Sequence, residues 1–314
     1  MRIRVYTVSA GLAILASACA PARRTSAPIM DTPSATPVHG VVVPAGGGER
    51  FVYCKRPLTL WLKVDSVTAP RTQLVAGTGE IRGDEGIGRH RGAHEVIYVR
   101  SGWGHAIVGV DTANLGPGSV MYVPPGTRHR LVSSGTAPLD YFWVLAPMSS
   151  GGVFRRAAML GCPSGPPASV TTPSAQPEPE QEEPGLVLPP GAGERLTYCL
   201  FPLTITFKVD SVTAPVSRLV AATGALRRGS EVGEHAVDEV VLITHGRGLA
   251  FVGADTMPVQ SGSIMYTPRG MRHGFINDST ETLEYVVVYG PFAGPRSRAS
   301  FRRLASQPGP SCPA

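Results

Sequence analysis

Short apolar runs separated by turn residues dominate this chain. Segments 59–64, 94–99, 119–123 and 139–145 are rich in β-branched and aromatic residues and have Gly or Pro near their ends. Runs of this length and composition predict β-strands. The 37 Gly and 30 Pro residues favour many turns over long helices. Several short strands in roughly 120 residues predict a sandwich or barrel, so the expected fold class is all-β.

The same pattern runs through the chain twice. The octapeptide KVDSVTAP occurs at 63–70 and again at 208–215, and GSVMYVPPGTRH at 118–129 has a near twin, GSIMYTPRGMRH, at 262–273. Matches of this length indicate a tandem duplication. A chain of 314 residues is long enough for two domains that each bury a core.

Two segments rich in Pro, Ser and Thr interrupt this pattern and lack hydrophobic periodicity, which is typical of flexible linkers. They place the boundaries of the repeats. The predicted organisation is a signal peptide at 1–18, a tether at 19–40, a first domain at 41–162, a Pro/Glu-rich linker at 163–185 and a second domain at 186–314.

The N-terminus predicts export. An Arg-containing start precedes an apolar run at 5–15, and Ala16, Ser17 and Ala18 lead to Cys19. These small residues resemble a bacterial lipobox, although the nearest leucine lies one position too early. The resemblance implies lipidation at Cys19, a membrane anchor and a place in the cell envelope on the periplasmic side. A plain secretory signal cleaved nearby is the alternative, and no other apolar run approaches the roughly 18 residues of a spanning helix.

Four further cysteines occupy equivalent places in the two repeats. Cys54 and Cys199 lie near the start of a repeat, and Cys162 and Cys312 lie at its end. An even number in an exported chain favours disulfides. We expect Cys54 to pair with Cys162 and Cys199 with Cys312, because each bond then joins the two ends of one domain. The alternative pairing would link the two domains to each other.

A second recurring motif carries the candidate chemistry. The pattern G-x5-P-x-G-x2-H-x3-N resembles the second signature of the cupin superfamily. Repeat two contains it in full, at Gly262, Pro268, Gly270, His273 and Asn277. Repeat one contains it with Ser in the last place, at Gly118, Pro124, Gly126, His129 and Ser133. The resemblance covers both repeats and implies a bicupin, with two β-barrels of the jelly-roll type in tandem.

The first cupin signature, which carries two His and one Glu, is kept only in part. The matching residues are His90 and Glu95 in repeat one and His235 and Glu239 in repeat two. Gly88 and Gly233 stand where the first His of the signature belongs. Each repeat therefore lacks one of the usual cupin ligands.

The remaining residues have the composition of a metal site with two His and one carboxylate. Because residues two apart on a strand share a face, each Glu heads a row of inward apolar residues, where a cation would balance its charge. The predicted ligands are His90, Glu95, His129, His235, Glu239 and His273. These donors accept Mn, Fe, Ni, Cu or Zn, so the expected cofactor is a divalent metal ion.

The functional prediction is a metal-dependent oxygenase, isomerase or hydrolase that acts on a small polar substrate. The alternative is a non-catalytic ligand-binding or structural module of the envelope. Tyr122 and Tyr266 are candidate acid–base groups, whereas His94 is expected on the opposite face from Glu95 as a surface residue. A formal net charge of +6 without any basic block does not predict nucleic-acid binding, and no phosphate loop or serine-hydrolase elbow occurs.

Overall fold

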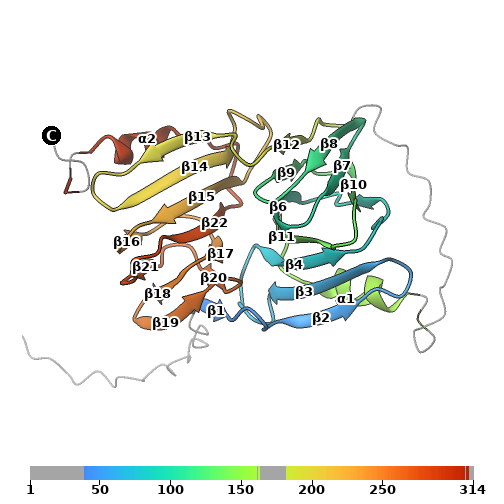
Figure 1. Ribbon diagram of the computed structural model, residues 1–314, viewed down its shortest axis with the longest axis horizontal. Helices are drawn as coiled ribbons and strands as arrows, with labels where there is room; N and C mark the ends of the chain where they lie inside the picture. Colours follow the sequence, from blue (N-terminus) through green and yellow to red (C-terminus); the bar gives the residue numbers. More distant parts are fainter. Residues whose placement is uncertain (1–38, 161, 163–181, 308, 311–314) are drawn as a thin grey trace, which may run out of the picture. The chain divides into compact units, whose positions relative to one another are not determined.

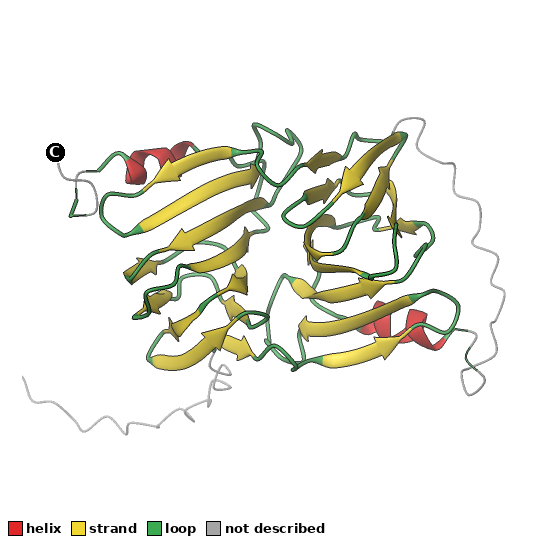
Figure 2. Ribbon diagram, viewed as in Figure 1, coloured by secondary structure: helices red, strands yellow, loops and turns green. Residues whose placement is uncertain are grey.

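The computed structural model of the chain describes residues 39–160, 162, 182–307 and 309–310. The predicted signal peptide, most of the tether and linker, Cys19 and Cys312 lie outside these residues. Almost all regular structure in the described part is β-strand, as the sequence predicts (Figure 2). Neither helix described there is both long and apolar enough to cross a bilayer.

Repeat one forms a seven-stranded and a four-stranded antiparallel sheet. The larger sheet contains, in spatial order, β12 (Leu186–Leu188), β9 (Val120–Val123), β6 (His94–Ser101), β11 (Leu139–Ala146), β4 (Val75–Ile81), β3 (Leu58–Val64) and β2 (Glu49–Val52). The smaller sheet contains β5 (Gly88–Arg89), β10 (Arg128–Ser133), β7 (Gly104–Val108) and β8 (Asp111–Leu115).

Repeat two forms the same pair of sheets. Its larger sheet contains β1 (Val41–Val43), β20 (Ile264–Thr267), β17 (Glu239–His245), β22 (Leu283–Tyr289), β15 (Val220–Leu226), β14 (Leu203–Val209) and β13 (Glu194–Thr197). Its smaller sheet contains β16 (Gly229–Gly233), β21 (His273–Asn277), β18 (Arg247–Val252) and β19 (Asp255–Gln260). Each repeat ends in one short helix, α1 (Gly152–Met159) or α2 (Ala299–Ala305). Two jelly-roll domains in tandem are therefore present, as predicted (Figure 1).

The two repeats exchange one strand each. β1, at the start of repeat one, pairs with β20 of repeat two, with Val41 opposite Tyr266 and Val43 opposite Ile264. Reciprocally, β12 at the start of repeat two pairs with β9 of repeat one, with Leu186 opposite Tyr122. Each exchanged strand covers an edge that would otherwise expose unpaired backbone groups.

The octapeptide shared by both repeats has a structural role in this exchange. Lys63 is buried, and its Nζ donates hydrogen bonds to the carbonyls of Ala45 and Gly47, both at 2.7 Å, just after β1. Lys208 is also buried and donates to Pro190 at 2.6 Å and to Ala192, just after β12. Each lysine thus provides a hydrogen-bond donor for carbonyl groups in the loop that follows the exchanged strand and leads back to the rest of its repeat.

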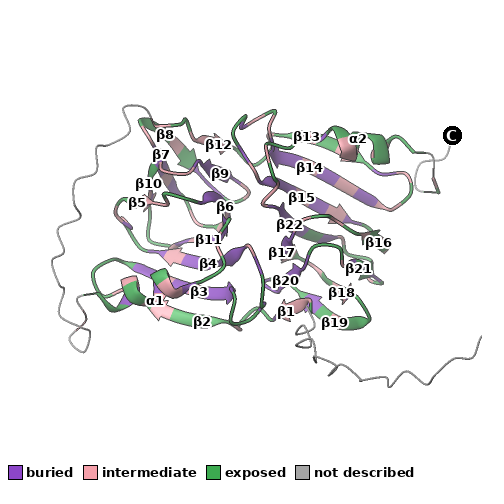
Figure 3. Ribbon diagram, turned by 180° about the vertical axis from the view of Figure 1, so that it is seen from behind, coloured by how far each residue is buried: buried purple, intermediate pink, exposed green. Residues whose placement is uncertain are grey.

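The central strands of each large sheet are buried along both faces (Figure 3). Val96 and Phe142 lie in one cluster with Val240 and Val286, and this cluster spans both repeats. Ile97 and Val241 face the interior of their own domains. The continuous burial follows because one face of the sheet lines its own domain and the other packs against the second repeat.

The disulfide expected for repeat one is present. Cys54 and Cys162 are bonded, which joins the segment before β3 to the segment after α1. Cys199 is also disulfide-bonded, but Cys312 lies outside the described residues, so the pairing of these two cysteines stays a prediction.

We expect a non-reducing digest of the oxidised protein to yield a peptide that joins Cys199 to Cys312. Reduction should then lower the free energy of unfolding, because each bond closes a loop of over a hundred residues, worth up to about 4.7 kcal/mol in the chain-entropy model. The double variant Cys54→Ser/Cys162→Ser is the matched control that keeps only the second bond. A digest in which Cys199 is joined to any other cysteine would contradict this pairing.

Candidate metal centres and cavities

In repeat two, the three predicted ligands converge on one point. His235 lies in the loop after β16, Glu239 begins β17 and His273 begins β21. The Nε2 atoms of His273 and His235 lie 3.0 and 3.3 Å from Glu239 Oε2. The ligand atoms all lie within 4.8 Å of one another, a spacing that suits a shared cation.

The three ligands of repeat one converge in the same way. His129 Nε2 lies 3.1 Å and His90 Nε2 3.5 Å from Glu95 Oε2, and the ligand atoms lie within 4.8 Å of one another. Glu95 Oε2 is buried and accepts no hydrogen bond from the described residues. A buried acceptor that faces two imidazoles without a donor is costly unless a proton or a cation lies between them.

The turn before the second His holds both histidines of each site. In repeat two the backbone N–H of Gly270 donates to the carbonyl of His235 at 2.7 Å, and Gly270 has a φ of +72°. In repeat one Gly126 donates to His90 at 2.8 Å with a φ of +84°. A left-handed backbone favours glycine, which explains why both copies of the motif carry it at this position.

The protonation of the second His supports a cation site. His273 Nδ1 donates to the carbonyl of Met271 at 2.8 Å, which leaves Nε2 of the neutral ring as a lone pair facing Glu239. Although burial acts to lower it, the Glu239 carboxylate raises the pKa of His273 to about 9, so the unmetallated ring holds a proton there. Burial lowers the pKa of His129 in repeat one to about 4. In both sites the donor set fits a divalent metal, which in repeat two would replace the proton that His273 shares with Glu239.

The positions of the missing signature histidine border the sites. A Cβ atom added at Gly88 would lie 2.8 Å from His129 Nε2, and one added at Gly233 would lie 3.1 Å from His235 Nε2. The imidazoles thus occupy the space that a side chain at either position would need, which explains why both positions carry glycine.

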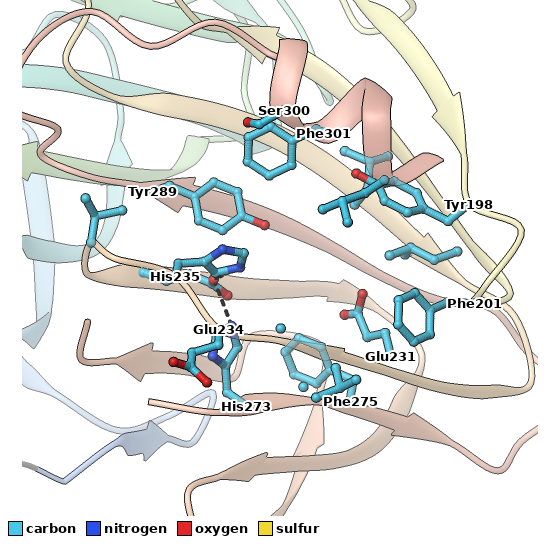
Figure 4. A pocket seen from close by; sticks show the side chains of 18 of the residues that line it. Tyr198, Phe201, Glu231, Glu234, His235, His273, Phe275, Tyr289, Ser300 and Phe301 are labelled. Atoms are coloured by element: carbon cyan, nitrogen blue, oxygen red, sulfur yellow. Dashed lines mark hydrogen bonds and ion pairs between the residues drawn. The ribbon is translucent and has the colours of Figure 1, made fainter. Parts of the chain in front are cut away.

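Each site opens into a cavity inside its own domain. The cavity of repeat two measures about 570 Å³ and that of repeat one about 420 Å³. Figure 4 shows the larger one, with His235 and His273 on one side and Tyr198 and Phe201 on the other. The terminal helices contribute to the walls through Phe301 of α2 in repeat two, and through Phe154 of α1 in repeat one.

Each cavity contains a carboxyl group that the sequence analysis missed, half-buried in repeat two and buried in repeat one. Glu231 on β16 lines the cavity of repeat two, and Tyr285 donates its hydroxyl to both carboxylate oxygens at 2.8 and 3.0 Å. Glu85 lines the cavity of repeat one and accepts the N–H of Leu131 at 2.8 Å. Burial raises the pKa of Glu231 to about 7 and that of Glu85 to about 8.

A signal for these carboxyl groups was present in the sequence. Glu85 precedes Gly88 by three residues, and Glu231 precedes Gly233 by two. An acidic residue thus comes shortly before the substituted signature position in both repeats. Because the spacing differs by one residue, the two glutamates do not align as a motif.

The candidate acid–base tyrosines were assigned to the wrong face. Tyr122 and Tyr266 lie in the apolar cluster between the repeats and do not line either ligand cavity. The register explains this, because Tyr122 pairs with Val96 whereas Glu95 pairs with Val123, so Tyr122 and Glu95 occupy opposite faces. The expectation for His94 was half right, since it faces away from Glu95 but is buried and hydrogen-bonded to Tyr122, 2.7 Å away.

Asn277, the last residue of the second signature, has a structural role. Its side-chain amide donates to the carbonyls of Leu226 and Glu281 at 2.9 and 2.7 Å. Its carbonyl oxygen accepts from Ser279. These bonds fix the turn after β21 rather than contributing a ligand.

Comparisons with known proteins agree with this architecture. Residues 79–145 and 224–289 each match the cupin domain family. An uncharacterized protein of Streptomyces coelicolor is 42% identical over 57 residues, which is 18% of this chain and 53% of that protein. The chain thus spans about half the length of that relative.

Solved structures of low identity share the fold. An oxalate decarboxylase variant from Bacillus subtilis superposes with a TM-score of 0.61 at 15% identity, over 81% of this chain and 78% of that one. The putative glyoxylate induced protein from Pseudomonas aeruginosa gives 0.58 at 14% identity, over 81% and 90%. Protein Ylba from E. coli gives 0.56 at 12%, over 80% and 90%. At these identities the likeness concerns the fold alone.

Proposed function

We propose that this chain, which carries two cupin domains in tandem, is a metal-dependent enzyme that acts on a small molecule. The observation that carries the proposal is the duplicated convergence of two imidazoles and one carboxylate at the wall of an internal cavity. The oxygenase, isomerase and hydrolase classes all use such a site. A divalent metal bound there would polarise a substrate oxygen or activate water.

The protein side chains would divide the remaining work. Glu231 and Glu85 lie in the same cavities as the triads and are held by Tyr285 and by the N–H of Leu131. Each is a carboxyl group whose pKa lies near neutral pH, so each can accept or donate a proton to a bound molecule. The largely apolar walls would limit the water around the reacting atoms.

The metal is drawn from Mn, Fe, Ni, Cu and Zn. Imidazole and carboxylate ligands suit all of them. Bacillus subtilis oxalate decarboxylase, one of the structural neighbours, has Mn(II) centers. Manganese is therefore the first ion to test.

A non-catalytic ligand-binding module is the second candidate. The observation in its favour is the glycine at 88 and at 233, which removes one customary ligand from both sites. Fewer protein ligands weaken metal binding, and the cavities would then serve to bind a small molecule without transforming it.

Metal analysis decides between these candidates. Protein purified without chelator or nickel resin is titrated with each divalent ion and its metal content is measured by elemental analysis. The enzyme proposal expects up to two ions per chain and substrate turnover that chelation abolishes. If the folded protein retains none of the ions, the enzyme proposal is wrong and the ligand-binding module is the remaining candidate.

We also propose that the protein is exported and lipid-anchored in the bacterial cell envelope. The support comes from the sequence of the first nineteen residues, which lie outside the described structure. The oxidised Cys54–Cys162 pair is in keeping with export, since disulfides persist in oxidising compartments. The anchored protein would act at the membrane surface.

Substitution of Cys19 by Ser is expected to release the protein from the membrane into the soluble fraction. The thioether-linked lipid requires the cysteine sulfur, so labelled fatty acid should enter the wild-type protein and not the variant. Cys54→Ser is the matched control that loses a cysteine but keeps the label. Wild-type protein that takes up no label would show that Cys19 is not lipidated.

A further inference from the structure

The mouths of the two cavities differ in charge at equivalent positions. Lys55 and Arg56 follow Cys54 in repeat one, and Leu200 and Phe201 follow Cys199 in repeat two. Both pairs line their own cavity. The dipeptide thus occupies the same position in both repeats, but it consists of two cations in repeat one and two apolar residues in repeat two.

In repeat one, the cationic pair lies beside the cavity opening. The Arg56 guanidinium donates to the carbonyl of Ile87 at 3.4 Å, in the loop that carries Glu85. A Cβ atom added at Gly86 would lie 3.6 Å from the centre of that guanidinium. Arg56 is thus held against the rim, and Lys55 adds a second exposed positive charge beside it.

In repeat two, the corresponding rim is apolar and the charges around it are mostly acidic. Figure 4 shows Glu231 between Phe201 and the histidines, with Glu234 near His273. Among the described lining residues, Arg296 is the one with a cationic Lys or Arg side chain, and its guanidinium lies over the Phe292 ring, 5.9 Å from the centroid. The walls also carry more aromatic rings than those of repeat one.

We infer that the two cavities have diverged in ligand class: repeat one binds a small carboxylate-bearing molecule, and repeat two binds an uncharged aromatic molecule. Lys55 and Arg56 in one repeat, and Leu200 and Phe201 in the other, determine this specificity. The inference rests on the proposal that the cavities receive small-molecule ligands.

The physical reason is the cost of an unpaired charge. A carboxylate that enters repeat one passes Lys55 and Arg56, which attract it through solvent. Both cavities contain a carboxyl group, Glu85 or Glu231, but repeat two lacks the cationic pair and has Glu234 as a further acidic group. A neutral aromatic molecule loses nothing at either rim but gains stacking contacts with rings such as Phe201 and Phe275 in repeat two. The repeat-two cavity therefore excludes anions and retains neutral rings.

The experiment exchanges the two dipeptides and measures the binding of two probes that share a naphthalene ring. The probes are 2-naphthoate, an anion, and 2-naphthol, which is neutral at neutral pH, titrated by calorimetry into manganese-loaded and metal-free full-length protein. Lys55→Leu/Arg56→Phe should weaken 2-naphthoate binding about three- to tenfold, the combined effect of losing two exposed ion pairs, and remove the salt dependence of that binding. Leu200→Lys/Phe201→Arg should add a second binding site for 2-naphthoate and weaken the binding of 2-naphthol.

The controls separate this inference from the metal proposal. All four substituted residues are outside the triads, so the metal content of both variants should equal that of wild type. Arg82→Leu removes an exposed charge outside the cavity and should leave 2-naphthoate binding unchanged. Equal affinity of wild type and Lys55→Leu/Arg56→Phe for 2-naphthoate would overturn the inference, whatever the metal content. Wild-type protein that holds no metal but keeps the probe selectivity would instead overturn the metal proposal alone.

Discussion

Replacement of Glu239 by Gln is expected to empty the metal site of repeat two while the fold survives. The amide has the same shape but no charge, and Glu239 Oε2 is the atom on which His235 and His273 converge. Loss of a group that merely orients a ligand costs roughly 10- to 100-fold in metal affinity, so loss of the carboxylate itself should exceed about 100-fold. Any turnover at this site should be lost with the metal.

The measurement is metal per chain by elemental analysis for wild type, Glu239→Gln and Glu95→Gln, with circular dichroism as the check on folding. We expect Glu239→Gln to lose more metal, because repeat two keeps the whole second signature and slightly shorter His–Glu distances. Glu234→Gln is the matched control, since Glu234 lines the same cavity outside the triad. A Glu239→Gln protein with unchanged metal content would mean that the triad is not the metal site.

Replacement of Arg298 by Ala is expected to destabilise the second domain by about 3–5 kcal/mol, the range for removing one partner of a buried ion pair. The Arg298 side chain is 4% exposed and donates to both carboxylate oxygens of Asp210, at 2.6 and 2.7 Å. Asp210 is fully buried, so its charge would lose its main partner. Because Arg298 precedes α2, the helix over the cavity should loosen as well.

Chemical denaturation of Arg298→Ala measures this cost. Arg302→Ala is the matched control, because Arg302 is an exposed arginine of α2 that pairs with Glu194, and its loss should have a much smaller effect. Arg155 in repeat one pairs with Asp65 in the same way but is half-exposed. The loss of stability in Arg155→Ala should therefore lie between those of the other two variants. Equal midpoints for Arg298→Ala and Arg302→Ala would show that the buried pair does not anchor α2.

The contribution of the Arg298–Asp210 pair to stability is expected to depend on pH. Burial acts to raise the pKa of Asp210, but the hydrogen bonds from Arg298 outweigh it and hold the pKa below the usual 3.8. A group whose pKa is lowered on folding stabilises the protein above its ordinary pKa and loses that contribution as the pH falls through the lowered value. The difference between wild type and Arg298→Ala should therefore narrow in strong acid.

The local pattern of the sequence was sufficient for the fold class and the duplication, and it named the three residues that converge in each repeat. Alternating apolar residues placed Glu95 on the same face as Ile97, and Glu239 on the same face as Val241, as the structure has them. The Pro-Gly turn before each second His is a local device, so its consequence for the histidine could be derived from neighbouring residues.

What covers the outer face of each strand was decided by the tertiary structure alone. Strand periodicity divides residues between two faces but does not say what covers either, and here a whole second repeat covers the outer one. This is why Tyr122 was expected in the cavity and why His94, on the face that was expected, is buried against Tyr122 instead of exposed. The strand exchange and the cavity position of Glu231 depend likewise on pairing between residues far apart in the chain, and no local pattern encodes such contacts.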